Sequence, residues 1–339
     1  MKINRRNIDL NIVKEAARAI TKGKLVAFPT ETVYGLGANA LDEAAVKKIF
    51  KAKSRPADNP LILHISEFSQ LRVLAKHLPR DAQLLAKKYW PGPLTIVVEK
   101  SDLVPSVVTA GLPTVAVRMP SHEVALALIK TAGVPIAAPS ANLSGRPSPT
   151  TAEHVIEDLY GKVDIIIDSG PTDIGLESTV INISRKPYLL LRPGRITLES
   201  LSKCIPIKLH PALKKTTKPK RPESPGMKYR HYAPRGKLIL LVGDRTKLIG
   251  VINQMSKEFK EAGLTVGVFS PFKAEFEADR AVLCYGSKEE FAKKLFMALR
   301  EFDSYDIDII LVAGISAKGL GRAVMNRLEK AAVYKVINL

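Results

Sequence analysis

Two short segments carry polar side chains in an arrangement suited to binding an anion. Lys53 and Arg55 are two residues apart, and the next residue, Pro56, favours an extended backbone at Arg55. Ser140 and Asn142 are also two residues apart and follow an apolar run. Because residues i and i+2 of an extended segment project to the same side, we expect two cations and two neutral groups to converge. Such a set fits a polyanion such as phosphate, carboxylate or bicarbonate.

Simpler structural roles exist for both segments. The two cations fit the C-terminal end of a helix, where positive charge is favourable in any case. Ser140 and Asn142 fit a turn that satisfies its own backbone. The stiff prolines around Lys53 and Arg55 favour the anion site there, whereas the second segment leaves the two interpretations evenly balanced.

A segment rich in hydroxyls and glycines follows an apolar strand predicted at residues 25–28. If residues 30–34 are extended, Thr30, Thr32 and Tyr34 lie on the same side. The Gly-x-Gly-x-x-Ala run that follows matches a dinucleotide fingerprint only weakly, because polar residues separate it from the strand. The segment is therefore either a glycine turn ahead of a helix or a backbone-lined pocket for a small ligand.

Further polar side chains stand at the ends of predicted strands. Ser178 precedes one strand, whereas Arg118 and Arg192 lie at the ends of two others. Each is a candidate donor to an anion, although a strand-end arginine often only pairs with a surface carboxylate. His64 lies near the end of another strand, where a single histidine is more often structural than catalytic.

Hydrophobic periodicity predicts two α/β regions joined by a linker. The expected domains are residues 1–203, an α/β sheet domain, and 236–339, a small Rossmann-like three-layer domain with a largely parallel sheet. Residues 204–235 are rich in proline and show little periodicity, which is typical of a linker. The predicted strands lie at 25–28, 61–65, 94–99, 114–118, 134–138, 165–168, 179–183, 188–191, 237–242, 264–269, 281–285, 307–313 and 333–337. The predicted helices lie at about 12–20, 42–50, 68–76, 80–89, 122–132, 151–159, 245–262, 287–299 and 320–332.

The linker combines cations with aromatic residues. Residues 206–235 contain nine Lys or Arg and a single acidic residue, Glu223, so part of the formal net charge of +19 belongs to the linker. A charged linker is usually solvated and extended. Its end places Tyr229, His231 and Tyr232 among cations, which predicts either a segment docked on the second domain or a mobile lid whose rings stack on a base.

Composition and motifs disfavour several classes of protein. There is no apolar run of about 18 residues and no signal-peptide core, so we expect a cytoplasmic protein without a membrane attachment. Cys204 and Cys284 are far apart, which argues against a disulfide framework or a zinc site. The chain has no GxxxxGK[ST], no second zincin histidine and no GxSxG motif. We therefore expect a site that works by positioning and charge neutralisation.

Five motifs, PTETVYGLG, KSRPADNPL, PSANLSG, ESTV and LRPG, follow one another along the chain. Together they resemble the YrdC-type L-threonylcarbamoyladenylate synthase family. The linker run SPGMKYRHYAP and the final GLGRAVMNRLEKAA resemble its two-domain form from archaea and fungi. The resemblance implies an N-terminal twisted α/β sheet around a large concave cleft. It also implies ATP-dependent synthesis of L-threonylcarbamoyl-AMP and pyrophosphate from L-threonine, bicarbonate and ATP.

The resemblance also implies roles for individual residues. Lys53 and Arg55 would be the catalytic cations that hold bicarbonate and phosphate oxygens, and Arg118 would bind the amino-acid carboxylate. Mg²⁺ would enter with ATP, and no residue of the chain is assigned to it as a ligand. A lid would include Tyr229, His231 and Tyr232. The other substrate- and nucleotide-binding residues would be Thr30, Thr32, Tyr34, Asn59, His64, Thr114, Ser140, Asn142, Ser178 and Arg192.

The resemblance further implies a partner that consumes the product. The threonylcarbamoyl group would pass to a KEOPS-like transferase complex acting on certain tRNAs, with weak or indirect contact between this chain and tRNA. Two other functions stay open. In the first, the chain is a binding module for tRNA or double-stranded RNA without nucleotide turnover. In the second, it is a carbamoyl-transfer domain that uses carbamoyl phosphate. Against the second, the chain lacks the cysteine-rich zinc segments of such proteins.

Overall fold

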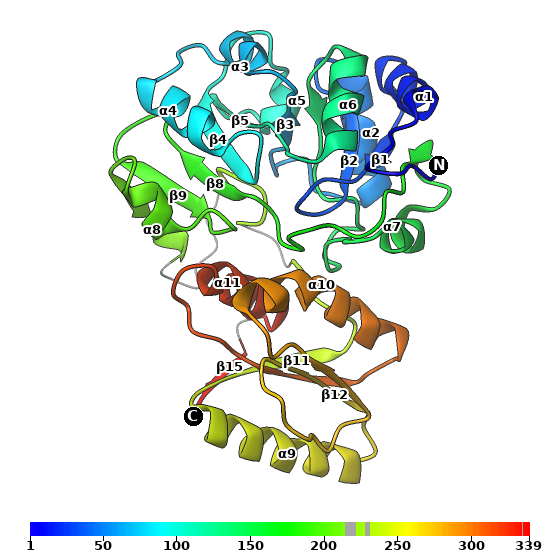
Figure 1. Ribbon diagram of the computed structural model, residues 1–339, viewed down its shortest axis with the longest axis vertical. Coiled ribbons are helices and arrows are strands. Elements are labelled where there is room, and N and C mark those ends of the chain that lie inside the picture. The colour runs from blue at the N-terminus through cyan, green and yellow to red at the C-terminus, as the bar shows by residue number, and fades with distance from the viewer. Residues whose placement is uncertain (214–221, 228–230, 334) are drawn as a thin grey trace. The chain divides into compact units, whose positions relative to one another are not determined.

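The computed structural model describes residues 1–213, 222–227, 231–333 and 335–339 (Figure 1). The chain divides into two compact units. The first comprises Met1–Ser144 and Ser148–Tyr229, and the second comprises Gly145–Pro147 and Arg230–Leu339. None of the helices within the described ranges is long and apolar enough to cross a bilayer.

The first unit is built on a ten-stranded sheet of mixed direction with the order β10-β9-β8-β4-β5-β3-β6-β2-β1-β7. Neighbours are parallel in β1–β7, β3–β5, β4–β8 and β9–β10, and antiparallel in the other pairs. The strands are β1 Val26–Phe28, β2 Gly35–Asn39, β3 Ile62–His64, β4 Leu94–Glu99, β5 Thr114–Arg118, β6 Ile136–Ala137, β7 Ile165–Ile166, β8 Thr179–Asn182, β9 Tyr188–Arg192 and β10 Ile207–Leu209. The helices are α1 Leu10–Thr21, α2 Glu43–Lys53, α3 Phe68–Leu74, α4 Arg80–Tyr89, α5 Ser106–Thr109, α6 Glu123–Ala132, α7 Ala152–Leu159, α8 Leu198–Ser202 and the 3₁₀ turn η1 Pro211–Leu213.

Helices α1 and α6 pack together over one end of this sheet (Figure 1). Helix α1 begins after Asp9, whose side chain accepts a hydrogen bond from the backbone N–H of Asn11. Its buried face carries Val13, Ala17 and Ile20, the spacing that the sequence predicts for an amphipathic helix. These side chains share a core with β1 and α6.

The middle strands of the sheet have two apolar faces of different kinds. On one face Leu63, Ile96 and Val117 belong to the main core, which includes residues of α2, α3, α4 and α7. The opposite face carries a small cluster of five buried residues, with Leu189 and Met227 packed against it, and it contains no helical residue. The five are Ile62, Val97, Ala116, Val180 and Leu191. We call this cluster the sheet floor.

The second unit is a three-layer α/β domain, as predicted. Its five-stranded sheet has the order β13-β12-β14-β11-β15, and all four neighbouring pairs are parallel. The strands are β11 Lys237–Val242, β12 Val266–Ser270, β13 Arg280–Leu283, β14 Ile309–Ala313 and β15 Val336–Asn338. Helix α9 Arg245–Glu261 lies on one side of the sheet and α10 Lys288–Ser304 and α11 Gly321–Ala331 on the other (Figure 1).

In two segments of the first unit the observed strands differ from the sequence-based interpretation. The glycine turn, one of the two interpretations of the segment before α2, does not form there, because residues 35–39 are strand β2, which pairs with β1 and β6. Gly37 permits this packing, since a Cβ there would lie 2.8 Å from side-chain atoms of both Phe28 and Ile136. Within the expected linker, residues 207–209 form strand β10, which pairs in parallel with β9 at the edge of the sheet. Its flanking prolines made this short edge strand resemble a linker.

Candidate active site

Two motifs far apart in the sequence lie side by side in the first unit. The backbone N–H of Leu36 donates to Pro139 O at 2.9 Å, and that of Ala141 donates to Tyr34 O at 2.8 Å. Gly35 and Ser140 form an isolated β-bridge between these hydrogen bonds. The hydroxyl-rich segment before β2 and the loop after β6 therefore form one wall.

Lys53 reaches this wall from the end of α2. It is the last helical residue, it is buried, and Ser54 caps the helix in the left-handed conformation with φ 51°. Its ammonium donates to the backbone carbonyls of Ser140 and Asn142. The extended geometry expected for residues 53–55 is therefore wrong, because Lys53 is helical and Ser54 turns the chain. The positive charge nevertheless lies at the loop after β6.

Arg55 stabilises the turn that leads into β3. Its Nη2 donates to the carbonyls of Asn59 and Pro60, both at 3.3 Å. Asn59 is 1% exposed, and its Oδ1 accepts no hydrogen bond within the described part of the chain. Lys53 and Arg55 thus donate to different pieces of backbone, and their convergence on one anion stays a prediction.

Ser140 and Asn142 face the same side, as predicted. The Ser140 hydroxyl donates to Asn142 Oδ1 at 2.6 Å, and Asn142 Nδ2 donates to Leu143 O at 2.8 Å. The pair therefore satisfies part of its own turn, which was the simpler of the two interpretations. This turn also borders the Lys53 ammonium, so the two interpretations are compatible.

Arg118 lies on the sheet-floor side at the end of β5 and makes three contacts with the surrounding loops. Nη1 donates to Thr32 Oγ1 at 2.9 Å, and Nε donates to Gly92 O at 3.4 Å. Nη2 lies 2.7 Å from Glu31 Oε1, and both side chains are 4% exposed. The guanidinium is therefore held in a fixed orientation.

Thr30 and Thr32 meet in a turn and not in an extended segment. Their hydroxyls are 2.8 Å apart. Thr30 Oγ1 also donates to Val33 O at 2.6 Å and accepts from the backbone N–H of Thr32 at 3.2 Å. The expected extended backbone is wrong because the Thr30 hydroxyl closes this turn, but the two hydroxyls do share one side.

His64 is the partner of Arg118 in the parallel register of β3 and β5. Its ring lies edge-on to Phe28, with centroids 6.1 Å apart. Burial, and then the charge of Arg118, lowers the pKa of the His64 imidazole to about 3. The ring is therefore neutral at pH 7, and within the described residues its buried Nδ1 has no hydrogen-bond partner.

A second positively charged site lies at the ends of β8 and β9, which come after β4 toward the β10 edge of the sheet. It consists of Arg192 and its hydrogen-bond partner Ser178. Arg192 Nε donates to Ser178 O and Nη2 donates to Ser178 Oγ, both at 3.0 Å. The Ser178 hydroxyl also lies 2.7 Å from Thr95 Oγ1. All three side chains are buried, so the structure brings this predicted pair together at the ends of β8 and β9.

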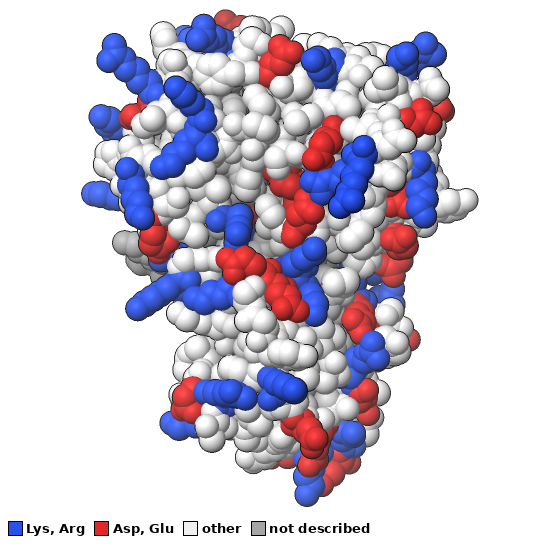
Figure 2. Space-filling model, in the orientation of Figure 1, with Lys and Arg blue, Asp and Glu red and all other residues white. Residues whose placement is uncertain are grey.

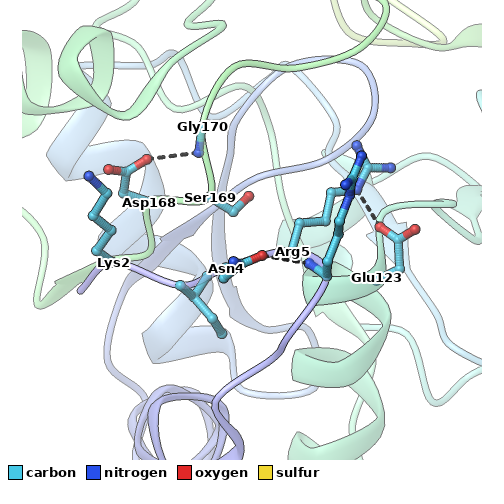
Figure 3. A pocket seen from close by; sticks show the side chains of 9 residues that line it. Lys2, Asn4, Arg5, Glu123, Asp168, Ser169 and Gly170 are labelled. Carbon is cyan, nitrogen blue, oxygen red and sulfur yellow. Dashed lines mark hydrogen bonds and ion pairs between the residues drawn. The ribbon is translucent and has the colours of Figure 1, made fainter.

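The side chains of two expected binding residues lie apart from these groups. Thr114 begins β5, so at ~3.3 Å per residue it is about 13 Å along the strand from Arg118. The Tyr34 hydroxyl donates to Gly170 O at 2.7 Å, and burial raises the pKa of this phenol. Gly170 lines a surface hollow that also contains Lys2, Arg5 and other residues (Figure 3).

This hollow is a poor candidate for the anion site because its cations are balanced by acids. Arg5 forms ion pairs with both Glu123 and Asp173. Figure 3 shows Arg5 turned toward Glu123 and Asp168 turned toward the backbone of Gly170. The cations around the loop after β6 are better placed for a polyanion.

The described linker residues 222–227 contact the first unit at two places. Met227 packs against the sheet floor. Four residues earlier, Glu223 accepts a hydrogen bond from Asn182 Nδ2 at 2.8 Å and lies 4.0 Å from His210 Nε2. Residues 222–227 therefore have a docking position on the first unit.

The predicted lid residues are placed differently. Tyr232 is 4% exposed, and its ring centroid lies 5.1 Å from that of Phe296 within the second unit. His231 contacts Tyr232, with ring centroids 5.5 Å apart. Tyr229 lies outside the described residues. A lid role for these three residues stays a prediction.

The described residues do not supply a cluster of metal ligands. No group of three or more His, Cys, Asp or Glu side chains in those ranges could hold a metal ion. The charges on the molecular face drawn in Figure 2 are of both signs and interspersed. Among the described residues of each unit on this face, basic side chains alternate with acidic ones, whereas a continuous basic stripe is typical of nucleic-acid binding.

Two family models together match most of the chain. The first, Sua5_yciO_yrdC, is described as "Telomere recombination" and matches residues 18–194. The second is described as "Threonylcarbamoyl-AMP synthase, C-terminal domain" and matches residues 196–333. The chain belongs to the Sua5/YciO/YrdC family. The resemblance drawn from the motifs is therefore confirmed.

Full-length relatives of this Sua5/YciO/YrdC-family chain carry one name. The threonylcarbamoyl-AMP synthase of Pyrococcus abyssi is 55% identical over 330 residues, which is 96% of each protein. That of Bacillus subtilis is 47% identical over 331 residues, covering 96% of this chain and 94% of the relative. A crystal structure of P. abyssi Sua5 complexed with L-threonine matches with a TM-score of 0.97 and 54% identity, covering 100% of this chain and 99% of that one. This Sua5/YciO/YrdC-family chain is accordingly an enzyme of the nucleotidyltransferase type.

Sequence reasoning missed Glu31 and Thr95. Glu31 is the only charged residue between Phe28 and Asp42. A single acid within an otherwise neutral, buried stretch indicates a buried ion pair, and this signal was available in the sequence. Thr95 gave no such signal, because an alternating strand accepts threonine on either face.

Proposed function

We propose that this chain synthesises L-threonylcarbamoyl-AMP and pyrophosphate from L-threonine, bicarbonate and ATP. The observation that carries the proposal is the wall formed by residues 30–36 and 139–142. One end of this wall meets the fixed guanidinium of Arg118, and the other meets the buried ammonium of Lys53. A carboxylate site and a phosphate site on one wall suit the joining of an amino acid to a nucleotide. The L-threonine complex of the P. abyssi relative supports the same substrate.

The chemistry requires two anions to meet. Threonine and bicarbonate give a carbamate, and its carboxylate oxygen must attack the α-phosphorus of ATP. Cations fixed beside the reacting groups offset the repulsion and orient the two reactants. In this proposal Arg118 binds the threonine carboxylate, with Thr30 and Thr32 beside it. Lys53 and Arg55 neutralise bicarbonate and phosphate oxygens.

The adenylate half of the site would use the remaining polar groups. Ser140 and Asn142 would hydrogen-bond the nucleotide from the loop after β6. Arg192, fixed by two hydrogen bonds to Ser178, would meet phosphate oxygens. The docked segment 222–227 would limit the access of water to the carbamate, which is labile in water.

Mg²⁺ would enter with ATP. The residues around Lys53 and Arg55 supply cations and neutral donors, which suit the phosphates and not the metal. The hard, oxygen-seeking ion would therefore take its ligands mainly from the triphosphate and water. Bound in this way, Mg²⁺ would neutralise phosphate charge. A KEOPS-like transferase in the cytoplasm would then use the product to modify tRNA.

A pyrophosphate-release assay tests the proposal. We expect release only when ATP, L-threonine and bicarbonate are all present, and loss of most activity in Arg55→Ala. The variant Lys51→Met, which removes an exposed cation from α2, is the matched control and should retain activity. Release of pyrophosphate that is independent of threonine would contradict the proposal. Tight, steeply salt-dependent RNA binding without any turnover would instead favour the RNA-binding alternative.

A further inference from the structure

Glu31 places a carboxylate with unmet hydrogen-bonding capacity inside the candidate site. Its side chain is 4% exposed, and Oε1 lies 2.7 Å from Arg118 Nη2. Oε2 is also buried and has no hydrogen-bond donor within the described ranges. Leaving a buried charged acceptor without a donor is costly. The geometry around Glu31 is therefore suited to a donor that a ligand supplies.

Arg118 next to it has capacity to spare for an anion. A guanidinium carries five N–H groups. In the described residues Arg118 donates two of them, one to Thr32 Oγ1 and one to Gly92 O, whereas Nη2 is ion-paired with Glu31 at 2.7 Å without making a hydrogen bond. Three N–H groups remain, and a carboxylate in a bidentate pair accepts two.

An α-amino acid carries a carboxylate and an ammonium on the same carbon. Arg118, with donors to spare, beside Glu31, with an unused acceptor, is the matching arrangement for these two groups. We propose that Glu31 binds the α-ammonium of the amino-acid substrate while Arg118 binds its carboxylate, and that Glu31 accepts the ammonium proton before the carbamate forms. This inference rests on the proposed function, because it names the residue that prepares threonine for reaction.

The proton transfer balances with the proposed reaction. The ammonium gives one proton to the Glu31 carboxylate, which leaves a neutral amine and a neutral acid. The nitrogen lone pair then attacks the bicarbonate carbon and forms the N–C bond. The C–OH bond breaks, and the departing hydroxide takes a second proton from nitrogen and leaves as water. The third hydrogen stays on the carbamate nitrogen, and Glu31 later returns its proton to solvent.

A purely structural role for Glu31 is the competing explanation. In that case Glu31 only orients Arg118, and removing its charge weakens the binding of every carboxylate ligand equally. If Glu31 contacts the ammonium directly, removing its charge weakens only ligands that carry an ammonium. A ligand without an ammonium never makes this contact, so its affinity does not change for this reason. The ratio of two affinities therefore separates the explanations.

The experiment compares L-threonine with 3-hydroxybutyrate, which has the same carboxylate and hydroxyl but no ammonium. Dissociation constants are measured by calorimetry without ATP for the wild-type chain, Glu31→Gln, and the exposed-site control Glu15→Gln. We expect the wild type and the control to bind L-threonine about 10- to 100-fold tighter than the analogue, as for a hydrogen bond to a charged group. In Glu31→Gln the ratio should fall close to one. An unchanged ratio in Glu31→Gln overturns the proposal.

A second variant covers the case in which Glu31→Gln does not fold. Glu31→Asp keeps a charge beside Arg118 but shortens its reach by one methylene. The affinity ratio should then lie between those of the wild type and one, with a lower kcat for pyrophosphate release. A ratio equal to that of the wild type in Glu31→Asp overturns the proposal. Failure of the proposed function itself is seen separately, as the absence of threonine- and bicarbonate-dependent pyrophosphate release by the wild type.

Discussion

Replacing Lys53 by methionine is expected to destabilise the first unit as well as to inactivate it. The Lys53 ammonium donates to the carbonyls of Ser140 and Asn142 from a position that is 1% exposed. Each carbonyl that loses a buried donor costs about 1–3 kcal/mol, so two cost about 2–6 kcal/mol. Methionine also removes the desolvation cost of a buried ammonium, which offsets part of this loss. We therefore expect the free energy of unfolding to fall by about 2–4 kcal/mol.

The single tryptophan makes this loss measurable in the first unit alone. Trp90 lies directly after α4, so its fluorescence in a urea titration reports the unfolding of that unit. A loss of this size corresponds to a shift of the urea midpoint by about 1 M toward lower concentration. Lys51→Met, on the exposed side of the same helix, should leave the midpoint unchanged. A wild-type midpoint in Lys53→Met would refute the view that the two carbonyls depend on this ammonium.

Other expectations concern the second positively charged site, the histidine beside Arg118 and the docked linker segment. Ser178→Ala removes the hydroxyl that accepts from Arg192 Nη2 and should raise the KM for ATP about tenfold at constant KM for threonine, as measured by initial rates of pyrophosphate release. The lowered pKa of His64, about 3 when folded, means that the unfolded chain binds the extra proton between about pH 6.5 and pH 3. Stability from this group is therefore complete above pH 6.5 and falls with decreasing pH by up to about 1.4 kcal/mol per pH unit, a slope that urea titrations should find reduced in His64→Phe. Met227→Ser weakens the packing on the sheet floor and should release the product faster, so that free threonylcarbamoyl-AMP breaks down sooner in a coupled assay. Chelation of Mg²⁺ should stop pyrophosphate release, and added Mg²⁺ should restore it without a change in the threonine affinity.

The parts of the fold that the sequence predicts well are those where side chains alone decide the structure. The apolar runs at 94–99, 114–118 and 237–242 match β4, β5 and β11 in both bounds. Strand β2 escaped prediction because its sequence, GLGAN, has little β-propensity and is held by ladder hydrogen bonds on both sides. The packing that requires Gly37 involves Ile136, about a hundred residues away, and no local pattern contains that information.

In the candidate site, too, the sequence predicts which residues take part but not how their side chains are oriented. Residue type and motif order selected the polar groups, and the structure brings Thr32 to Arg118, Ser178 to Arg192 and Lys53 to the loop after β6. Their orientation was not predictable, since it depends on a left-handed residue at Ser54 and on a hydroxyl-closed turn at Thr30. Both are local conformations, closed by bonds within three or four residues, that the residue types alone do not specify. Pro56 indicates a stiff backbone after Arg55, but it does not indicate the direction in which the Arg55 side chain points.

The position of Lys53 at the end of α2 has a consequence for how the sequence of this helix can vary. Val46, Ile49 and Phe50 form the buried stripe of α2, and Lys53 extends that stripe by one more turn. Deleting or inserting one residue within the helix would rotate everything beyond it by about 100° and shift it by about 1.5 Å along the axis. The Lys53 ammonium would then move away from the loop after β6, although Lys53 itself had not been replaced. Changes of length in homologous chains should accordingly fall outside α2.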